Sequence, residues 1–271
     1  MKTPSIPLAA AFPAICLLLL SSCRKEYLYF EKHPQELAGL CQIKQMINSG
    51  DPDPEGRRWD TLTFTYNAWG DPVSALRKGL PGTGSPNFEF RYDKYHRLTE
   101  FLGVYAANGG ETWHIYSYTD SRSQYPYADT EYIFPTTIAN PPPPSYLERR
   151  ATAYEYDSKG RITKTTEQSS FPNTLPVVQT FTYNPDGSEP YLQPVYDDKV
   201  NLNLTNKVWM FLNRSYSPHN PFTAVSYNAY GLPTLIDFSS SGNVYYYFNS
   251  EQETILAQFV YDCPCQLSSY K

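Results

Sequence analysis

A short phrase recurs along most of this chain and constrains its fold more than any other feature. The phrase is an aromatic residue, any residue, Tyr, Asp or Asn, two further residues and Gly, followed by alternating polar and apolar residues. Its clearest copy is residues 154–162, YEYDSKGRI. Four further copies begin at residues 64, 90, 181 and 225, and degenerate ones lie at 116–120 and 245–249.

Each position of the phrase has a physical reason. Two aromatic residues two positions apart point to the same face of a strand. The Asp or Asn side chain can accept a hydrogen bond from a backbone N–H two residues on and so begin a turn. The Gly supplies the positive φ that the turn requires. Each phrase therefore predicts a β-hairpin, and because one hairpin is not stable alone, we expect neighbouring hairpins to pair in a sheet.

The composition supports this reading, since 25 Tyr and 24 Pro are present and the prolines fall mostly between the periodic segments. We predict an all-β protein in which residues 41–271 form a single domain. Its hairpins follow one another as an antiparallel meander, and the sheet twists into an open barrel or roll. Two segments interrupt the pattern: a proline-rich insertion at 121–150, and residues 191–221, for which a short helix and an irregular loop both remain open.

The phrase at residues 154–162 resembles the YD repeat of RHS and teneurin proteins. The whole set resembles more closely a group of Bacteroidota lipoproteins built from divergent YD-like hairpins. This resemblance covers residues 41–265. It implies an extracytoplasmic β-rich protein, and it leaves open a role as an accessory of an RHS-like secretion or toxin system.

The N-terminus predicts where the protein resides. Lys2, an apolar stretch and small residues make a secretory signal peptide over residues 1–22. Leu20-Ser21-Ser22-Cys23 resembles the bacterial lipobox, which implies a lipid on Cys23 and palmitate among its acyl chains. Two or three acyl chains hold a protein firmly on a membrane. We expect a spacer over residues 23–40 and an anchor in the cell envelope, most consistently the outer membrane, on its surface or its periplasmic face.

Three cysteines remain for the domain, Cys41, Cys263 and Cys265. An exported protein can form disulfides. A bond from Cys41 to either of the other two would join the ends of the domain and stabilise it by roughly 4 to 5 kcal/mol. A bond between Cys263 and Cys265, free thiols and a shared metal site are the alternatives, and the spacing is a poor match to zinc.

The sequence predicts no catalytic site, no metal site and no cofactor. The four histidines, including His96 and His114, lack metal-ligand spacing, and there is no nucleophile elbow or phosphate loop. The net charge is -5 and the basic residues are scattered, so we expect no nucleic-acid partner. The protein is therefore not expected to be an enzyme.

The function that this pattern favours is a non-enzymatic, lipid-anchored structural or binding module. Rows of Tyr and Trp can stabilise a sheet as cross-strand pairs. The alternative is that such rings, where exposed, bind a glycan or a peptide. Asp60-Thr61-Leu62 fits a short O-glycosylation pattern, so Thr61 is a candidate modification site.

Overall fold

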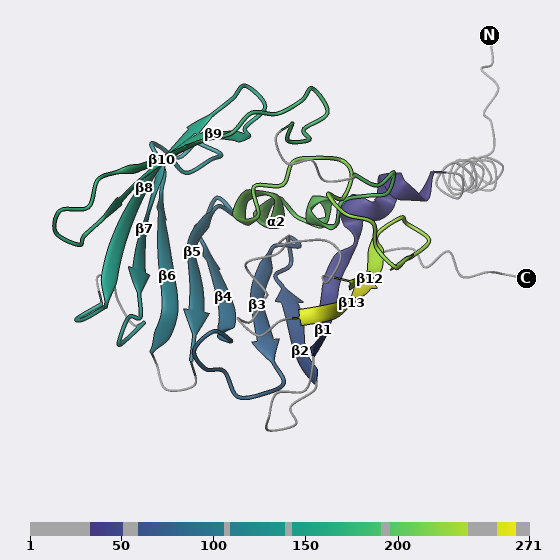
Figure 1. Ribbon diagram of the computed structural model, residues 1–271, viewed down its shortest axis with the longest axis horizontal. Coiled ribbons are helices and arrows are strands. Elements are labelled where there is room, and N and C mark those ends of the chain that lie inside the picture. Colours follow the sequence, from purple (N-terminus) through teal and green to yellow (C-terminus); the bar gives the residue numbers. More distant parts are fainter. Residues whose placement is uncertain are drawn as a thin grey trace, which may run out of the picture.

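Antiparallel strands form one continuous, curved sheet in this protein (Figure 1). The computed structural model describes residues 33–50, 59–105, 109–138, 143–190, 196–237 and 254–263. Over these residues the sheet has 13 strands, with little helix. The all-β meander that the hairpin phrase predicts is confirmed. The sheet stays open, with β10 and β11 as its two edges.

The strands are β1 (Gln42–Gly50), β2 (Trp59–Tyr66), β3 (Pro72–Arg77), β4 (Asn87–Tyr92), β5 (Leu98–Val104), β6 (Gly110–Ser117), β7 (Ala128–Ile133), β8 (Glu148–Tyr156), β9 (Ile162–Ser169), β10 (Val177–Thr180), β11 (Ser226–Tyr227), β12 (Pro233–Asp237) and β13 (Thr254–Asp262). The helical elements are two 3-10 helices, η2 (Pro34–Leu40) and η3 (Leu202–Thr205), and one α-helix, α2 (Lys207–Leu212).

The chain runs through the sheet in order from β1 to β10 and then crosses back. Residues 196–225, which include η3 and α2, make this return, and β11, β12 and β13 then extend the sheet on the other side of β1. β13 pairs antiparallel with β1, so Gln42 lies opposite Asp262. The first and last strands are therefore neighbours, and the two ends of the domain meet at one rim of the sheet.

The repeated phrase forms the same turn in several hairpins. In the clearest copy the backbone N–H of Asp157 donates to the carbonyl of Arg161, and that of Gly160 donates to Asp157, each at 3.0 Å. The Asp157 carboxylate accepts from the backbone N–H groups of Lys159 and Arg161. Gly160 has a φ of 77°, as the turn requires. The turns that begin at Asn67, Asp93 and Asn228 repeat these bonds.

The tyrosine of the phrase has a role that the hairpin argument does not foresee. In four copies its hydroxyl donates to a backbone carbonyl of the preceding hairpin, at the first residue of the return strand. The pairs are Tyr92 with Pro72 (2.7 Å), Tyr118 with Leu98 (2.8 Å), Tyr183 with Ile162 (2.7 Å) and Tyr261 with Pro233 (2.8 Å). These bonds link consecutive hairpins, so the repeat encodes their packing as well as their turns.

The main core lies on the concave face of the sheet, under α2 (Figure 1). Trp209 of α2 is fully buried and packs edge-on against Phe64 and Phe90, with ring centroids 5.8 and 5.5 Å away. The side chain of Asn206 caps the helix by accepting from the backbone N–H of Val208. Residues 191–221 therefore contain a short helix, one of the two forms that the sequence left open for this segment.

The predicted proline-rich insertion at 121–150 contains a strand of the sheet. β7 falls within it and pairs with both β6 and β8. The segment that follows β7 packs on the convex face, where Ile138 contacts a small cluster of Leu102, Trp113 and Tyr132. The prolines thus lengthen a hairpin connection and leave the meander intact.

The structure reveals one further copy of the phrase, which the sequence pattern did not identify. Phe259-Val260-Tyr261-Asp262 has the aromatic, Tyr and Asp of the motif, and Tyr261 makes the same hydroxyl bond as the other copies. The copy lacks the Gly, since Cys265 stands at that position of the phrase. The degenerate copy at 245–249 lies outside the described residues.

Candidate functional site

Beyond α2, the side chains on the concave face change from apolar to ionisable. On β6 to β9 its inward positions carry ionisable side chains, which cross-strand pairing brings together. His114, Glu131, Arg150 and Ser169 lie in one row across the four strands. Asp129 and Glu167 lie in the next row, with Thr152 between them. The acidic patch comprises His114, Asp129, Glu131, Glu148, Arg150 and Glu167.

His114 lies at the border between this patch and the core. Its Nδ1 donates to Asp129 Oδ2 at 2.7 Å, and its Nε2 lies 3.4 Å from Glu131 Oε1. Its ring stacks between Phe101 and Tyr116. Burial alone would lower the pKa of His114, but the hydrogen bond to Asp129 and the charges of both carboxylates raise it overall. The structure thus favours the cationic form of this imidazole.

Arg150 lies at the centre of the carboxylates. It pairs with Glu148 at 2.9 Å and lies 3.8 and 3.9 Å from Glu131 and Glu167. Hydrogen bonds from Arg150 and Ser169 hold the pKa of Glu148 below its usual range. The pKa of Glu167 is raised, because burial, together with the neighbouring carboxylates, outweighs the attraction of Arg150. The patch therefore carries more negative charge than its two cations balance.

Two hydroxyl groups complete the hydrogen bonding of the patch. The hydroxyl of Tyr154 donates to Asp129, and that of Ser169 donates to Glu148, so each is bonded to a carboxylate and neither to His114. Within the described residues no three His, Cys, Asp or Glu side chains have the geometry to hold a metal ion. What the patch presents is negative charge on a rigid sheet, beside the aromatic rings of Tyr116, Tyr154 and Phe211.

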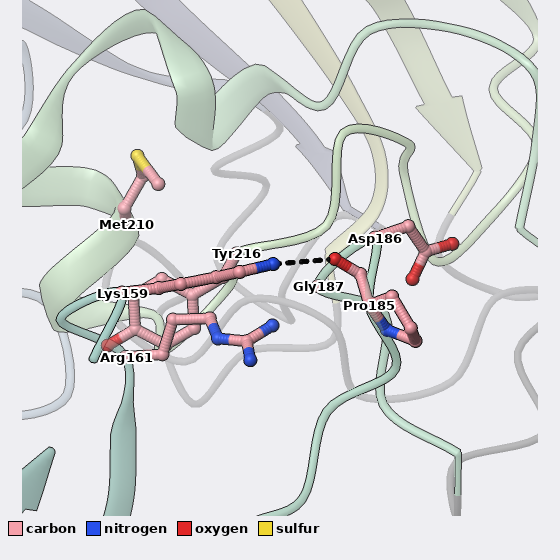
Figure 2. Close-up of a pocket in the computed structure, with 7 residues that line it drawn as sticks. All are labelled: Lys159, Arg161, Pro185, Asp186, Gly187, Met210 and Tyr216. Atoms are coloured by element: carbon pink, nitrogen blue, oxygen red, sulfur yellow. Dashed lines mark hydrogen bonds between the residues drawn. The ribbon is translucent and has the colours of Figure 1, made fainter. Parts of the chain in front are cut away.

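A small cavity of about 210 Å³ lies between two turns of the phrase and the segment after α2 (Figure 2). Lys159 Nζ donates across it to the carbonyl of Pro185 at 2.9 Å. Arg161 on its wall pairs with Asp157 and donates to the carbonyl of Asn184. Because Lys159 and Arg161 both bind groups of the protein itself, we interpret the cavity as a packing gap between neighbouring turns and not as a ligand site.

The predicted site residues have different outcomes. The structure joins Cys41 to Cys263 by a disulfide, one of the pairings that the sequence left open. Cys23 and Cys265 lie outside the described residues. Thr61 lies within β2 and is half-buried, and the preceding Asp60 forms an ion pair with Arg77. Glycosylation of Thr61 remains a prediction.

The aromatic rows serve mainly inside the fold. The tyrosines of the phrase are partly buried, and their hydroxyls bond the backbone as described above. Aromatic rings are exposed at a few turns instead, notably Trp69 and Tyr95. Among the described residues, no helix combines the length and the apolar character that crossing a membrane requires.

Sequence reasoning did not find the acidic patch. Its signal was present as charged residues two positions apart, in Asp129-Thr130-Glu131 and Glu148-Arg149-Arg150. Such pairs point to one face of a strand. Asp129 and Glu148 lie in the segment predicted to be an insertion, so no strand was expected there. The two-residue spacing of the charges was therefore not recognised as one face of a strand.

No protein-family model matches the chain, and no curated protein matches it. The chain's function must therefore be argued from its own residues.

Proposed function

We propose that this protein is a non-enzymatic binding module held on the cell envelope by a lipid at Cys23. The Cys41–Cys263 disulfide supports export, because such bonds persist in oxidising compartments. With a sequence separation of 222, the bond contributes about 5 kcal/mol in the chain-entropy model. It also ties the last strand to the point where the chain from Cys23 enters the domain.

Labelling with radioactive palmitate tests the tether. The wild-type protein should incorporate the label in a globomycin-sensitive way, and Cys23→Ala should abolish it. Cys16→Ala is the matched control, since Cys16 lies within the predicted signal peptide and should leave labelling unchanged. Label that persists in Cys23→Ala would contradict the anchor. Protease treatment of intact cells then separates a surface location from a periplasmic one.

We further infer that the acidic patch is the ligand-facing surface. The observation that carries this is the excess of carboxylates on the part of the concave face that α2 does not cover. Charge of one sign on a concave surface attracts ligands of the opposite sign. The partly exposed rings of Tyr154 and Phe211 beside the patch can pack on the apolar part of the same ligand or make cation–π contacts. The ligand class is therefore a cationic peptide segment.

Binding of a fluorescent oligolysine peptide tests this inference. The wild-type protein should bind the peptide with an affinity that falls as salt rises. Glu131→Gln with Glu167→Gln should weaken binding, because both carboxylates belong to the patch. The matched control is Glu155→Gln, an exposed carboxylate of β8 that pairs with Lys164 outside the patch. The patch variant removes two charges and the control one, so an equal loss per charge in the two would show that only overall charge matters, and the inference would fail.

The alternative of a glycan-binding face rests on exposed aromatic rings, and most tyrosines of the phrase are bonded into the fold. The RHS-like role stays a prediction based on the repeat alone.

A further inference from the structure

One rim of the sheet gathers the turns of the repeated phrase. In an antiparallel meander every second connection lies on the same side, and here these are the turns at 67–71, 93–97, 157–161 and 228–232 and the longer connection between β6 and β7. β1 begins at this rim and β13 ends there, so the Cys41–Cys263 disulfide lies on it too. We call it the turn rim. It is the upper edge of the sheet in Figure 1.

An exposed apolar group lies on the turn rim where the N-terminal segment enters. Leu40 is 60% exposed and directly precedes Cys41. Trp69 is 69% exposed, and its turn lies close to the start of β1, since a Cβ atom on Gly70 would lie 3.3 Å from the Gln42 side chain. The Trp69 and His96 rings have centroids 4.0 Å apart, and Tyr95 beside them is 46% exposed. Leu40, Trp69, Tyr95 and His96 form the rim patch.

Turn geometry does not require these aromatic residues. Trp69 and Tyr95 occupy the third position after the phrase tyrosine, where the equivalent residues are Lys159 and Tyr230. The turn with Lys159 makes the same backbone bonds. Tyr230 is buried in a core cluster, whereas Trp69 and Tyr95 remain largely open. Tyr95 contacts Lys94 and Arg97 and Trp69 contacts His96, and much of both rings is still exposed.

We propose that the rim patch rests in the headgroup region of the membrane that holds Cys23. This rests on the proposed lipid anchor. His33 follows Cys23 by ten positions, and ten residues span at most about 35 Å even when fully extended. Because η2 leads from His33 directly to Cys41, the tether begins at this rim and keeps the rim within its own reach of the lipid.

Chemistry favours contact once the rim is close. Trp and Tyr side chains combine an apolar body with a polar group, and they concentrate at membrane–water interfaces. A leucine beside them adds apolar area, and each buried methylene contributes about 0.8 kcal/mol. With the turn rim on the lipid, the strands project away from it and the acidic patch on their concave face stays in water.

The charges on this rim distinguish lipid from other coverings. Exposed cations and anions alternate on and beside its turns, as Lys94, Arg122 and Lys159 against Asp120, Asp186 and Asp262. Such a balanced rim is not drawn specifically to anionic lipids or to a strongly charged partner. Contact through the rim patch should therefore occur on neutral phosphatidylcholine and depend little on salt.

Fluorescence quenching by brominated lipids tests the proposal. The mature acylated protein is placed in phosphatidylcholine vesicles that contain lipid brominated near the headgroup, and tryptophan emission is measured. Trp69 should be quenched, and Trp69→Phe should lose most of the quenching. The matched control adds Leu80→Trp to Trp69→Phe. Leu80 is exposed in the connection after β3, at the opposite rim, and a tryptophan there should not be quenched.

Unchanged quenching in Trp69→Phe, or equal quenching of the tryptophan at position 80, would overturn the proposal. The intact mass of the protein reports acylation separately, so a missing anchor is not confused with a missing rim contact. If the mass shows no lipid, a Cys23→Ala protein whose mature N-terminus carries a hexahistidine tag is held on nickel-chelating lipid. The tether then starts at the same residue, and quenching of Trp69 still decides the question.

Discussion

The two halves of the concave face share one backbone plan and carry opposite chemistry. Over β2 to β5 the inward positions are Phe64, Phe90 and Phe101, which form the core with Trp209 of α2. Over β6 to β9 the same alternation presents the acidic patch. Turns and tyrosine hydroxyls hold the strands together in both halves. The inward side chains are thus free to differ: they are apolar under Trp209 of α2, aromatic where Phe211 contacts Tyr116 and Tyr154, and charged beyond these rings.

Trp209→Ala should have the largest effect, because it empties the contact between α2 and the apolar half. Truncating a buried Trp usually lowers the free energy of unfolding by about 3–5 kcal/mol. Urea denaturation of the oxidised protein measures the change. Trp69→Ala is the matched control, and since Trp69 is largely exposed the change should stay within about 0.5 kcal/mol. Equal losses would mean that α2 does not anchor the core.

Gly160→Ala should come next, at about 2 kcal/mol, and it should cost more than Gly70→Ala. Both glycines have positive φ, a conformation that costs other residues about 1–2 kcal/mol. A Cβ atom on Gly160 would also overlap the Tyr125 ring, whereas one on Gly70 meets only the end of the Gln42 side chain. Denaturation curves of both variants give the comparison. A larger loss for Gly70→Ala would contradict the packing of Tyr125 on the turn.

Tyr92→Phe and Tyr183→Phe should each cost about 1 kcal/mol, the net value of one hydrogen bond. One variant probes the apolar half and the other the half with the acidic patch, so equal effects would confirm that the hydroxyl bond belongs to the repeat. Tyr127→Phe serves as the control, since this ring is exposed. The idea fails if only one of the two tyrosines contributes.

The smallest effect concerns pH. The folded pKa of His114 is raised above the unfolded value of about 6.5. The stability that its charge contributes is therefore fully present below about pH 6.5 and is lost as pH rises through the folded pKa. The difference in unfolding free energy between wild type and His114→Gln should therefore shrink as pH rises from about 6.5 through the folded pKa. A difference that grows with pH would show that the neutral imidazole is the favoured form.

Much of this fold could be predicted from the sequence because its determinants are local. An Asp157 that accepts two backbone N–H groups and a Gly160 at positive φ act within five residues, so the pattern is visible in the chain. The pairing of β1 with β13 depends on the return of the chain through α2, which no local pattern encodes. The apolar run of α2 is also too short for periodicity to separate helix from strand.

The acidic patch lay beyond sequence reasoning for a related reason. Its residues come from four strands, and cross-strand register alone places Glu131 between His114 and Arg150. Register follows from loop lengths and from the tyrosine bonds between hairpins, such as Tyr156 to the carbonyl of Pro126. Once β7 is known to be a strand of the sheet, the two-residue spacing of Asp129 and Glu131 predicts that both side chains lie on the same face.

Carboxyl footprinting tests the contrast between the two halves most directly. The native protein is treated with a water-soluble carbodiimide and an amine, and labelled residues are located by mass spectrometry. Glu131 and Glu167 should react, as the exposed Glu155 does, while the buried Asp129 should not. With the oligolysine peptide present, the small-amine label on Glu131 and Glu167 should be replaced by amide cross-links to the peptide's own amines, while Glu155 should keep the small-amine label. If Glu131 and Glu167 react only after unfolding, the patch is a second closed core and the account of an open ligand-facing surface is wrong.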